Sequence, residues 1–390
     1  MHILLAQFYS SAPAPDFHEM AKALRSWGHN VLVATPDRAG DLEWHDGERA
    51  IAVIPGPGQM RGWMRSARLI ELVVTRLMQI GFLMRVRAFI KSRHADVVQI
   101  NPPDYACLIP LLMPRGMYFI LDVRQAGEVG GAGLKGKFKN WKSIASLRAN
   151  GRWFYDHACF ATEAAARRVL GDHWERWATV HRVGQDPQFL EYQWEERQKA
   201  TGDGPVRFVY IGTLSRVRAL EHIFAAVQWL LARTGAFRVE FVGPDAADGF
   251  YHRLLSDMKL DHVIELKPAV RYQQVPQVVA SHDVALAYVP PLPDWKYQPT
   301  LKVLEYRALG MPIIASDNEP NREVVEDGVN GLLIDDSVEG LGGAMFRYIQ
   351  DREFLHRCQQ NARLMRRGRT WSDSAKRYEE VVYRQANHGQ

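Results

Sequence analysis

The sequence alternates short apolar strands with helical segments, and this alternation constrains the fold more than any other feature. Residues 2–6 are an apolar strand, residues 17–27 have the pattern of a helix, and residues 30–35 are a second strand. Gly28 suits the C-cap of that helix, and strand, helix and strand in close succession indicate a parallel βαβ unit. Further strands are predicted at 51–54, 97–100, 117–121, 157–160 and 178–182.

A polar segment interrupts the alternation once, and the pattern then starts again. Residues 184–206 show no apolar periodicity and end in Gly-Asp-Gly-Pro, which indicates an interdomain connection. Two runs of this kind predict an α/β protein with two doubly wound Rossmann-like domains facing a cleft, with ligands at the carboxyl ends of the strands. The second run contains strands predicted at 207–212, 237–242, 262–266, 283–288, 312–315 and 331–334.

The domain boundaries follow from this pattern. A length of 390 residues agrees with two domains, and 47% apolar residues are enough to give each domain a packed core. We predict an N-terminal domain at residues 1–185, a linker at 186–206, a C-terminal domain at 207–370, and a last helix within 371–390 that packs back on the N-terminal domain.

Charge, cysteine content and apolar stretches restrict which ligands and which cellular compartment we expect for the protein. The formal net charge of +5 fits phosphorylated ligands or an anionic membrane surface and does not require nucleic acid. Cys107, Cys159 and Cys358 lie far apart without Cys-x-x-Cys spacing, so we expect reduced thiols in a cytoplasmic protein. The N-terminus lacks a positively charged leader, and no uninterrupted apolar stretch of about 18 residues occurs, so no membrane span is expected.

The segment 296–316, which reads KYQPTLKVLEYRALGMPIIAS, has the pattern of an anion-binding helix start. Pro299 suits the first turn of a helix, and the backbone N–H groups of Thr300 and Leu301 would then be free to bind phosphate. Lys302 is unfavourable for the helix dipole in the first turn, so an anionic ligand explains this lysine better.

Glu305 follows about one helical turn later, where its carboxylate can accept hydrogen bonds from a ribose diol. The whole pattern, P-x-x-K-x-x-E-Y-x-A-x-G-x-P-I-I-A, resembles the donor-site signature of retaining glycosyltransferases of family four, which have the GT-B fold. In that family the glutamate binds the ribose, and the helix start holds the diphosphate of a nucleotide-sugar. The alternative interpretation is an ordinary amphipathic helix capped by Gly310.

Residues 210–230 resemble the first strand and helix of the donor domain in this family. The resemblance implies that Gly212 and Thr213 line the donor site and that a basic residue of the following loop faces the diphosphate. Arg218 matches that basic residue and Arg216 is the second choice, while a solvated loop charge is the alternative for each. Cations aimed at the leaving diphosphate stabilise the transition state more than the ground state.

Further stretches carry the resemblance. Residues 266–291 resemble the segment that contains the base-binding loop, which implies that Val270 and Arg271 belong to the donor site. Residues 319–335 resemble the element that closes the donor domain, and residues 28–35 resemble part of the N-terminal half.

Three positions depart from the family pattern. The stretch SSAPAP at 10–15 replaces the usual Gly-Gly loop, and Tyr297 replaces the first glutamate of the Glu-x7-Glu motif. On the acceptor side, Gln125 occupies the position of the usual His or Asp, with Asp122 or Arg124 as alternatives if the alignment shifts. Gln and Tyr can hydrogen-bond a sugar hydroxyl but carry no negative charge at neutral pH, so the details of catalysis stay open.

The resemblance implies a glycosyltransferase that moves a sugar from a UDP- or GDP-sugar to a glycan or lipid-linked acceptor with retention, in the synthesis of a cell-surface polysaccharide or glycoconjugate. Arg218 and Lys302 are the catalytic candidates. No Asp-x-Asp triplet occurs, so we expect a metal-independent enzyme without a cofactor besides its donor substrate. Two alternatives stay open: a degenerate nucleotide-sugar-binding partner of another transferase, and a sugar-nucleotide epimerase.

The tract 61–92 is a second basic feature. On a helix, Arg65, Arg76 and Lys91 are among the residues that fall on one basic face. One interpretation places this face on anionic lipid, which makes the protein peripheral on the inner face of the cytoplasmic membrane. The other interpretation is a core-packed helix with a solvated basic side.

Overall fold

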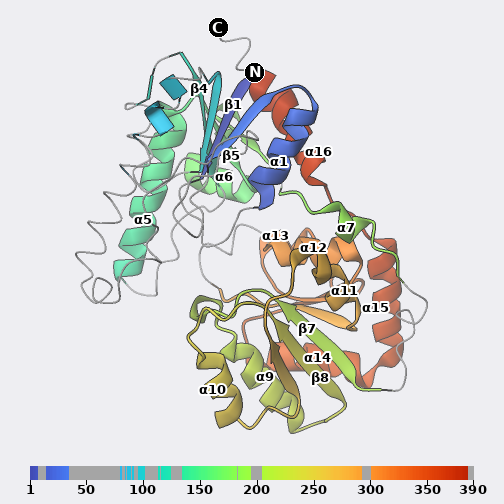
Figure 1. The fold of residues 1–390 in the computed structure, drawn as a ribbon. Coiled ribbons are helices and arrows are strands. Elements are labelled where there is room, and N and C mark those ends of the chain that lie inside the picture. Colours follow the sequence, from blue (N-terminus) through green and yellow to red (C-terminus); the bar gives the residue numbers. More distant parts are fainter. Residues whose placement is uncertain are drawn as a thin grey trace. The chain divides into compact units, whose positions relative to one another are not determined.

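The computed structural model divides the chain into two compact units (Figure 1). Unit 1 comprises Met1–Gly184 together with Trp371–Gln390, and unit 2 comprises Gln185–Thr370. The structure describes residues 1–7, 15–34, 80, 84, 86–88, 90–91, 95–101, 113–114, 116–123, 134–181, 183–194, 204–291 and 300–384.

Unit 1 is built on a six-stranded parallel sheet with the order β2-β1-β3-β4-β5-β6. The register places Ile3 beside Val31 on one side and beside Val97 on the other, and all three side chains are buried. Short, nearly continuous apolar runs form such strands because helices cover both faces of a parallel sheet. The strands are β1 (His2–Gln7), β2 (Asn30–Ala34), β3 (Val97–Asn101), β4 (Tyr118–Val123), β5 (His157–Phe160) and β6 (Ala178–Val180).

Several helices accompany this sheet, and their ends follow the capping chemistry of the sequence. Thr162 caps the N-terminus of α6, where its hydroxyl accepts a hydrogen bond from the backbone N–H of Ala165. The helices are α1 (Pro15–Ser26), α5 (Leu134–Ala149), α6 (Glu163–Leu170) and α16 (Trp371–Tyr378), with the shorter η3 (Asn150–Phe154), η4 (Trp174–Arg176) and η7 (Glu379–Tyr383).

The end of the chain belongs to unit 1. α16 packs against α1, and the Tyr383 hydroxyl donates a hydrogen bond to the buried Gln99 side chain at 2.7 Å. Gln99 in turn donates to the carboxylate of Asp122 at 3.1 Å. Burial raises the pKa of Asp122 to about 7, against the opposing effect of hydrogen bonds from Gln99 and Tyr378. Asp122, an alternative for the acceptor-side position, therefore belongs to a polar network inside unit 1.

Unit 2 repeats the architecture with a second six-stranded parallel sheet, in the order β12-β11-β10-β7-β8-β9. The strands are β7 (Val206–Ile211), β8 (Phe237–Val242), β9 (Ile264–Lys267), β10 (Val284–Ala287), β11 (Ile313–Ser316) and β12 (Gly331–Ile334). The helices are α7 (Pro187–Leu190), α9 (Glu221–Leu231), α10 (Phe250–Asp257), α11 (Val275–Ala280), α12 (Leu301–Leu309), α13 (Glu319–Arg322), α14 (Val338–Gln350) and α15 (Arg352–Leu364), with η5 (Arg216–Arg218) and η6 (Tyr272–Gln274).

Two apolar clusters cover the two faces of the unit 2 sheet. Phe208 and Tyr210 of β7 face a cluster with α9, α10 and α14, whereas Val209 between them faces a cluster with α11 and α12. Successive side chains of a strand point to opposite faces, so one strand contributes to both layers. The helix that carries Lys302 and Glu305 therefore packs on the second face.

The first and last residues of unit 2 lie side by side. The backbone N–H of Gln185 donates to the carbonyl of Arg369 at 2.7 Å, and the N–H of Arg369 donates to the Gln185 side chain at 3.0 Å. α7 follows directly, so residues 185–194 of the segment predicted as a connection pack within unit 2. Residues 195–203 lie outside the described residues.

The prediction of an α/β chain with two doubly wound Rossmann-like units is confirmed. The strand predicted at 51–54 and most of the tract 61–92 lie outside the described residues, as does Cys107. Cys159 and Cys358 are free, buried thiols. None of the helices that the structure describes is long and apolar enough to cross a bilayer.

Candidate functional site

The candidate site lies where the backbone leaves the carboxyl end of β7, in unit 2. Gly212 follows this strand with a φ of 145°, and its N–H donates to the carbonyl of Val242 at 3.0 Å. A Cβ placed on Gly243 would lie 2.1 Å from the carbonyl oxygen of Gly212, so only glycine fits at position 243. Thr213, predicted beside Gly212, is half-buried in the loop that follows.

α12 starts next to this strand end. Its N-cap, Thr300, has an extended backbone and makes no side-chain capping bond, and its buried hydroxyl has no hydrogen-bond partner among the described residues. The helix begins at Leu301 and ends at Gly310, which has a φ of 83° as a C-cap often requires. The Tyr306 hydroxyl accepts a hydrogen bond from the N–H of Ile211 at 2.9 Å and so fixes α12 to the end of β7.

Lys302 is the most unusual side chain of the candidate site. It is only 6% exposed, and its ammonium group has no hydrogen-bond partner among the residues that the structure describes. The Nζ atom lies 3.7 Å from the centre of the Tyr210 ring and would lie 3.4 Å from a Cβ on Gly212. Burial, together with the charge of Arg218, holds the pKa of Lys302 well below its usual range, and the nearby Glu305 only partly offsets this.

Glu305 is also buried, and it is held by a residue that the sequence did not single out. The Tyr272 hydroxyl donates a hydrogen bond to Oε1 of Glu305 at 2.6 Å. Burial raises the pKa of Glu305 to about 7, while the Tyr272 bond and the charge of Lys302 act in the opposite direction. The charge of Asp186, at the N-terminus of α7, contributes a further rise.

The two arginines of η5 have different surroundings. The charge of Arg218 acts on Lys302 and on the buried Tyr210, whose pKa burial raises to about 12. The guanidinium group of Arg216 instead lies 3.6 Å from the centre of the Phe250 ring and 3.9 Å from the carboxylate of Glu221. Arg218, the first choice from the sequence, is therefore the one that the structure groups with Lys302.

Val270 and Arg271 follow β9 and lead into η6, which contains Tyr272. Val270 is partly buried against the α11–α12 cluster, whereas Arg271 is exposed. The backbone N–H of Arg271 donates to the Gln274 side chain at 3.2 Å. This short segment therefore joins the predicted base-binding position to the tyrosine that holds Glu305.

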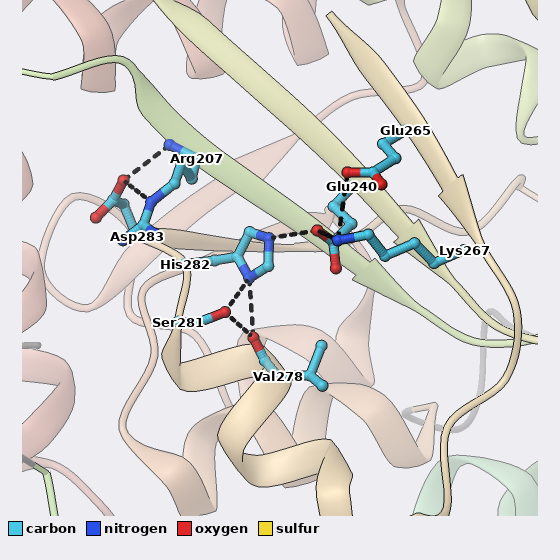
Figure 2. Close-up of polar contacts among 8 residues, drawn as sticks. All are labelled: Arg207, Glu240, Glu265, Lys267, Val278, Ser281, His282 and Asp283. Carbon is cyan, nitrogen blue, oxygen red and sulfur yellow. Dashed lines mark hydrogen bonds and ion pairs between the residues drawn. The ribbon is translucent and has the colours of Figure 1, made fainter.

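An ion-pair cluster fixes the strand from which this segment departs (Figure 2). The ammonium group of Lys267, the last residue of β9, lies 2.6 Å from the carboxylate of Glu240 and 3.3 Å from that of Glu265. His282 approaches the same oxygen of Glu240 at 3.6 Å. The pKa of Glu240 falls to about 2, chiefly through its hydrogen bond with His282 and further through Lys267. These charges are paired with one another and support the frame of the site.

The structure thus brings together Gly212, Arg218, Lys302 and Glu305 around the start of α12. Gln125 and Tyr297 lie outside the described residues. Within the described ranges, no group of three or more His, Cys, Asp or Glu side chains could hold a metal ion.

Sequence reasoning missed Tyr210, Tyr272 and Asp186. Tyr272 stands next to the predicted base-binding residues, and its hydroxyl could have been considered as a partner for a buried carboxylate. The sequence identifies Tyr210 only as part of a strand, and Asp186 lies in the segment predicted as an interdomain connection. No local sequence pattern indicates that Tyr210 contacts Lys302 or that Asp186 raises the pKa of Glu305, because both effects arise from tertiary packing.

The part of the chain that contains these residues is similar to a known protein family. Residues 205–351 match the family model described as Glycosyl transferases group 1. This match confirms the predicted resemblance for the part of the chain that contains Gly212, Lys302 and Glu305. The D-inositol 3-phosphate glycosyltransferase of Nocardioides sp. is 28% identical over 189 residues, which are 46% of this chain and 41% of that protein. The chain therefore matches less than half the length of this curated relative.

Solved structures extend the similarity of fold to the whole chain. Sucrose-phosphate synthase from Thermosynechococcus elongatus has a TM-score of 0.72 at 14% identity, with all of both chains covered. HepE from Anabaena in complex with UDP has a TM-score of 0.70 at 13% identity, covering 98% of this chain and 100% of that chain. At these identities the comparisons establish the GT-B fold.

Proposed function

We propose that the protein is a glycosyltransferase that binds the diphosphate of a nucleotide-sugar at the start of α12. The proposal depends above all on Lys302, a buried cation without a hydrogen-bond partner among the described residues. A buried charge is costly unless it is paired, and the charge of Arg218 makes the cost larger. A diphosphate would supply the missing negative charge and would accept hydrogen bonds from Lys302 and from the backbone N–H groups of the helix start.

Glu305 gives the proposal its second element. Tyr272 occupies one carboxylate oxygen of Glu305, and the remaining lone pairs can accept hydrogen bonds from the ribose hydroxyls of the donor. The segment with Val270 and Arg271 leads directly into Tyr272, which supports a position for the base beside the ribose. The solved complex of HepE with UDP belongs to a protein of the same fold, which also supports a nucleotide ligand.

The chemistry follows from where charge develops during the reaction. When the bond between the anomeric carbon and the diphosphate oxygen breaks, negative charge accumulates on the leaving diphosphate. Lys302 and Arg218 would stabilise that charge more strongly in the transition state than in the ground state. We further propose transfer with retention, without a metal ion or cofactor, to a glycan or lipid-linked acceptor in the synthesis of a cell-surface polysaccharide or glycoconjugate.

Nucleotide binding by the variant Lys302→Ala tests this proposal. Loss of a charge-assisted hydrogen bond should weaken binding by about 1.5–3 kcal/mol, or roughly 10- to 100-fold in Kd. Isothermal titration calorimetry with UDP, GDP and ADP would measure this loss for whichever nucleotide the wild type binds. Lys259→Ala removes an exposed lysine of the same unit and should leave the affinity unchanged. Wild-type affinity in Lys302→Ala would place the nucleotide elsewhere.

Product analysis separates the proposed reaction from the two alternatives. The wild-type protein would be incubated with UDP- and GDP-sugars, and the nucleotides separated by chromatography. A transferase releases the nucleoside diphosphate, an epimerase returns an isomeric donor, and a binding protein without activity returns the donor unchanged. Release of the diphosphate that disappears in Lys302→Ala is the expected result.

A further inference from the structure

The two halves of α5 have different surroundings. Near its C-terminal end, Leu147 is buried, and the guanidinium group of Arg148 donates a hydrogen bond to the carbonyl of Val169 in α6 at 2.7 Å. Figure 1 shows α5 beside α6 in unit 1. The N-terminal half instead presents large apolar side chains to solvent: Leu134 is 85% exposed, and Phe138 and Trp141 are each 65% exposed.

These apolar side chains form one stripe. Residues 134, 138 and 141 follow the spacing of one helix face, within an arc of about 60° at 100° per residue. The rings of Phe138 and Trp141 stack on each other with centroids 5.9 Å apart. Lys137 and Lys142 are exposed and border the stripe on its two sides. We call these five residues the α5 stripe.

The charge of α5 is entirely positive. The helix contains four lysines and one arginine in sixteen residues and has no Asp or Glu. A partner that covers the α5 stripe must therefore accept apolar side chains and carry negative charge beside them. The surface of an anionic bilayer has both properties, since its headgroups attract lysines while aromatic rings lie at the boundary with the acyl chains.

We propose that the α5 stripe docks unit 1 on an anionic lipid surface. Phe138 and Trp141 enter the interface between headgroups and acyl chains, and Lys137 and Lys142 remain at the level of the phosphates. The basic tract 61–92 of the sequence is not needed for this surface, because every residue of the stripe lies in α5. Docking also does not depend on the proposed transferase activity, so a failure of one leaves the other testable.

Binding of the full chain to vesicles tests the proposal. Co-sedimentation would compare vesicles of phosphatidylcholine alone with vesicles that contain one quarter phosphatidylglycerol, at low and high salt. We expect binding only to the anionic vesicles and a strong loss at high salt. Lys137→Glu combined with Lys142→Glu should weaken partition at least about 25-fold, since each basic residue near an anionic surface contributes about fivefold.

Matched variants of unit 1 assign the effect to α5. Arg167→Glu combined with Arg176→Glu makes the same change in charge at exposed positions of α6 and η4, and binding should change far less. Trp141→Ser should weaken partition roughly tenfold or more, whereas Trp177→Ser, at another exposed tryptophan, should not.

Three results would overturn the proposal. The first is equal binding to neutral and anionic vesicles, and the second is an equal loss in the variant pairs of α5 and of α6 with η4. The third is absence of binding by the wild type, which would indicate that a protein surface covers the stripe. Circular dichroism of each variant confirms that it is folded before these comparisons are made.

Discussion

Replacement of Glu305 by glutamine is expected to stabilise unit 2 while it weakens nucleotide binding. Burial raises the pKa of this carboxyl from 4.5 to about 7 in the folded protein, despite the Tyr272 hydrogen bond and the charge of Lys302. Because the folded-state pKa is the higher one, the stability contributed by the protonated form is complete below pH 4.5 and is lost as the pH rises to about 7. That loss amounts to about 3 kcal/mol.

The glutamine is neutral at every pH and can still accept the hydrogen bond from Tyr272. The glutamine no longer attracts Lys302, and this loss reduces the increase in the free energy of unfolding. We therefore expect Glu305→Gln to be about 1–3 kcal/mol more stable than the wild type at pH 8. For a unit of this size, each kcal/mol corresponds to an increase of about 2–4 °C in Tm. At pH 4 the wild-type carboxyl is protonated in both states, and the two proteins should unfold at similar denaturant concentrations.

Urea unfolding, followed by circular dichroism, measures the difference in stability between the two proteins at pH 8 and at pH 4. Glu326→Gln is the matched control, because Glu326 is an exposed glutamate of the same unit. Glu326→Gln should have the same free energy of unfolding as the wild type at both pH values. A variant Glu305→Gln that is less stable than the wild type at pH 8, or equally stabilised at pH 4, would refute the view that burial sets the pKa of Glu305.

Two further predictions concern the frame of the site. Gly243→Ala should destabilise unit 2 by about 1–3 kcal/mol, because the new Cβ would lie 2.1 Å from the carbonyl oxygen of Gly212; urea unfolding checks this, and an unchanged midpoint would contradict it. Glu240→Gln should cost about 1–2 kcal/mol at pH 7, after allowance for the partial exposure of Lys267. Since the pKa of Glu240 is lowered to about 2, the stability it contributes is present above pH 4.5 and is lost as the pH falls through about 2. Urea unfolding at several pH values should show that the destabilisation caused by Glu240→Gln decreases over the same pH range.

The sequence predicted those features of the site that local pattern encodes. Pro299 and Gly310 predicted a helix near 300–309, and the structure has α12 at Leu301–Leu309. The roles of Lys302 and Glu305 towards an anion and a ribose stay predictions. These signals lie within one helix, where a proline, a glycine and a periodicity of 3.6 residues carry the information.

The partners of these residues could not be predicted in the same way. Tyr272 and Glu305 are 33 positions apart in the sequence, and the Tyr210 ring that lies against Lys302 of α12 belongs to strand β7. Arg216 and Arg218 belong to the same short turn, and what distinguishes them is their tertiary surroundings: Arg216 contacts Phe250 and Glu221, whereas the charge of Arg218 acts on Lys302. Such contacts depend on how loops and helices pack, which no local periodicity records.

The position of α16 affects how the chain matures during synthesis. Tyr378 and Tyr383 belong to the same apolar cluster as Ile3 and Leu5, although nearly the whole sequence separates them. Residues 185–370 leave the ribosome before Trp371, so unit 2 has its complete sequence while unit 1 still lacks α16 and η7. Unit 1 is therefore translated first but completed after unit 2, because its strand β1 packs against Tyr378 and Tyr383 only once these residues have been made.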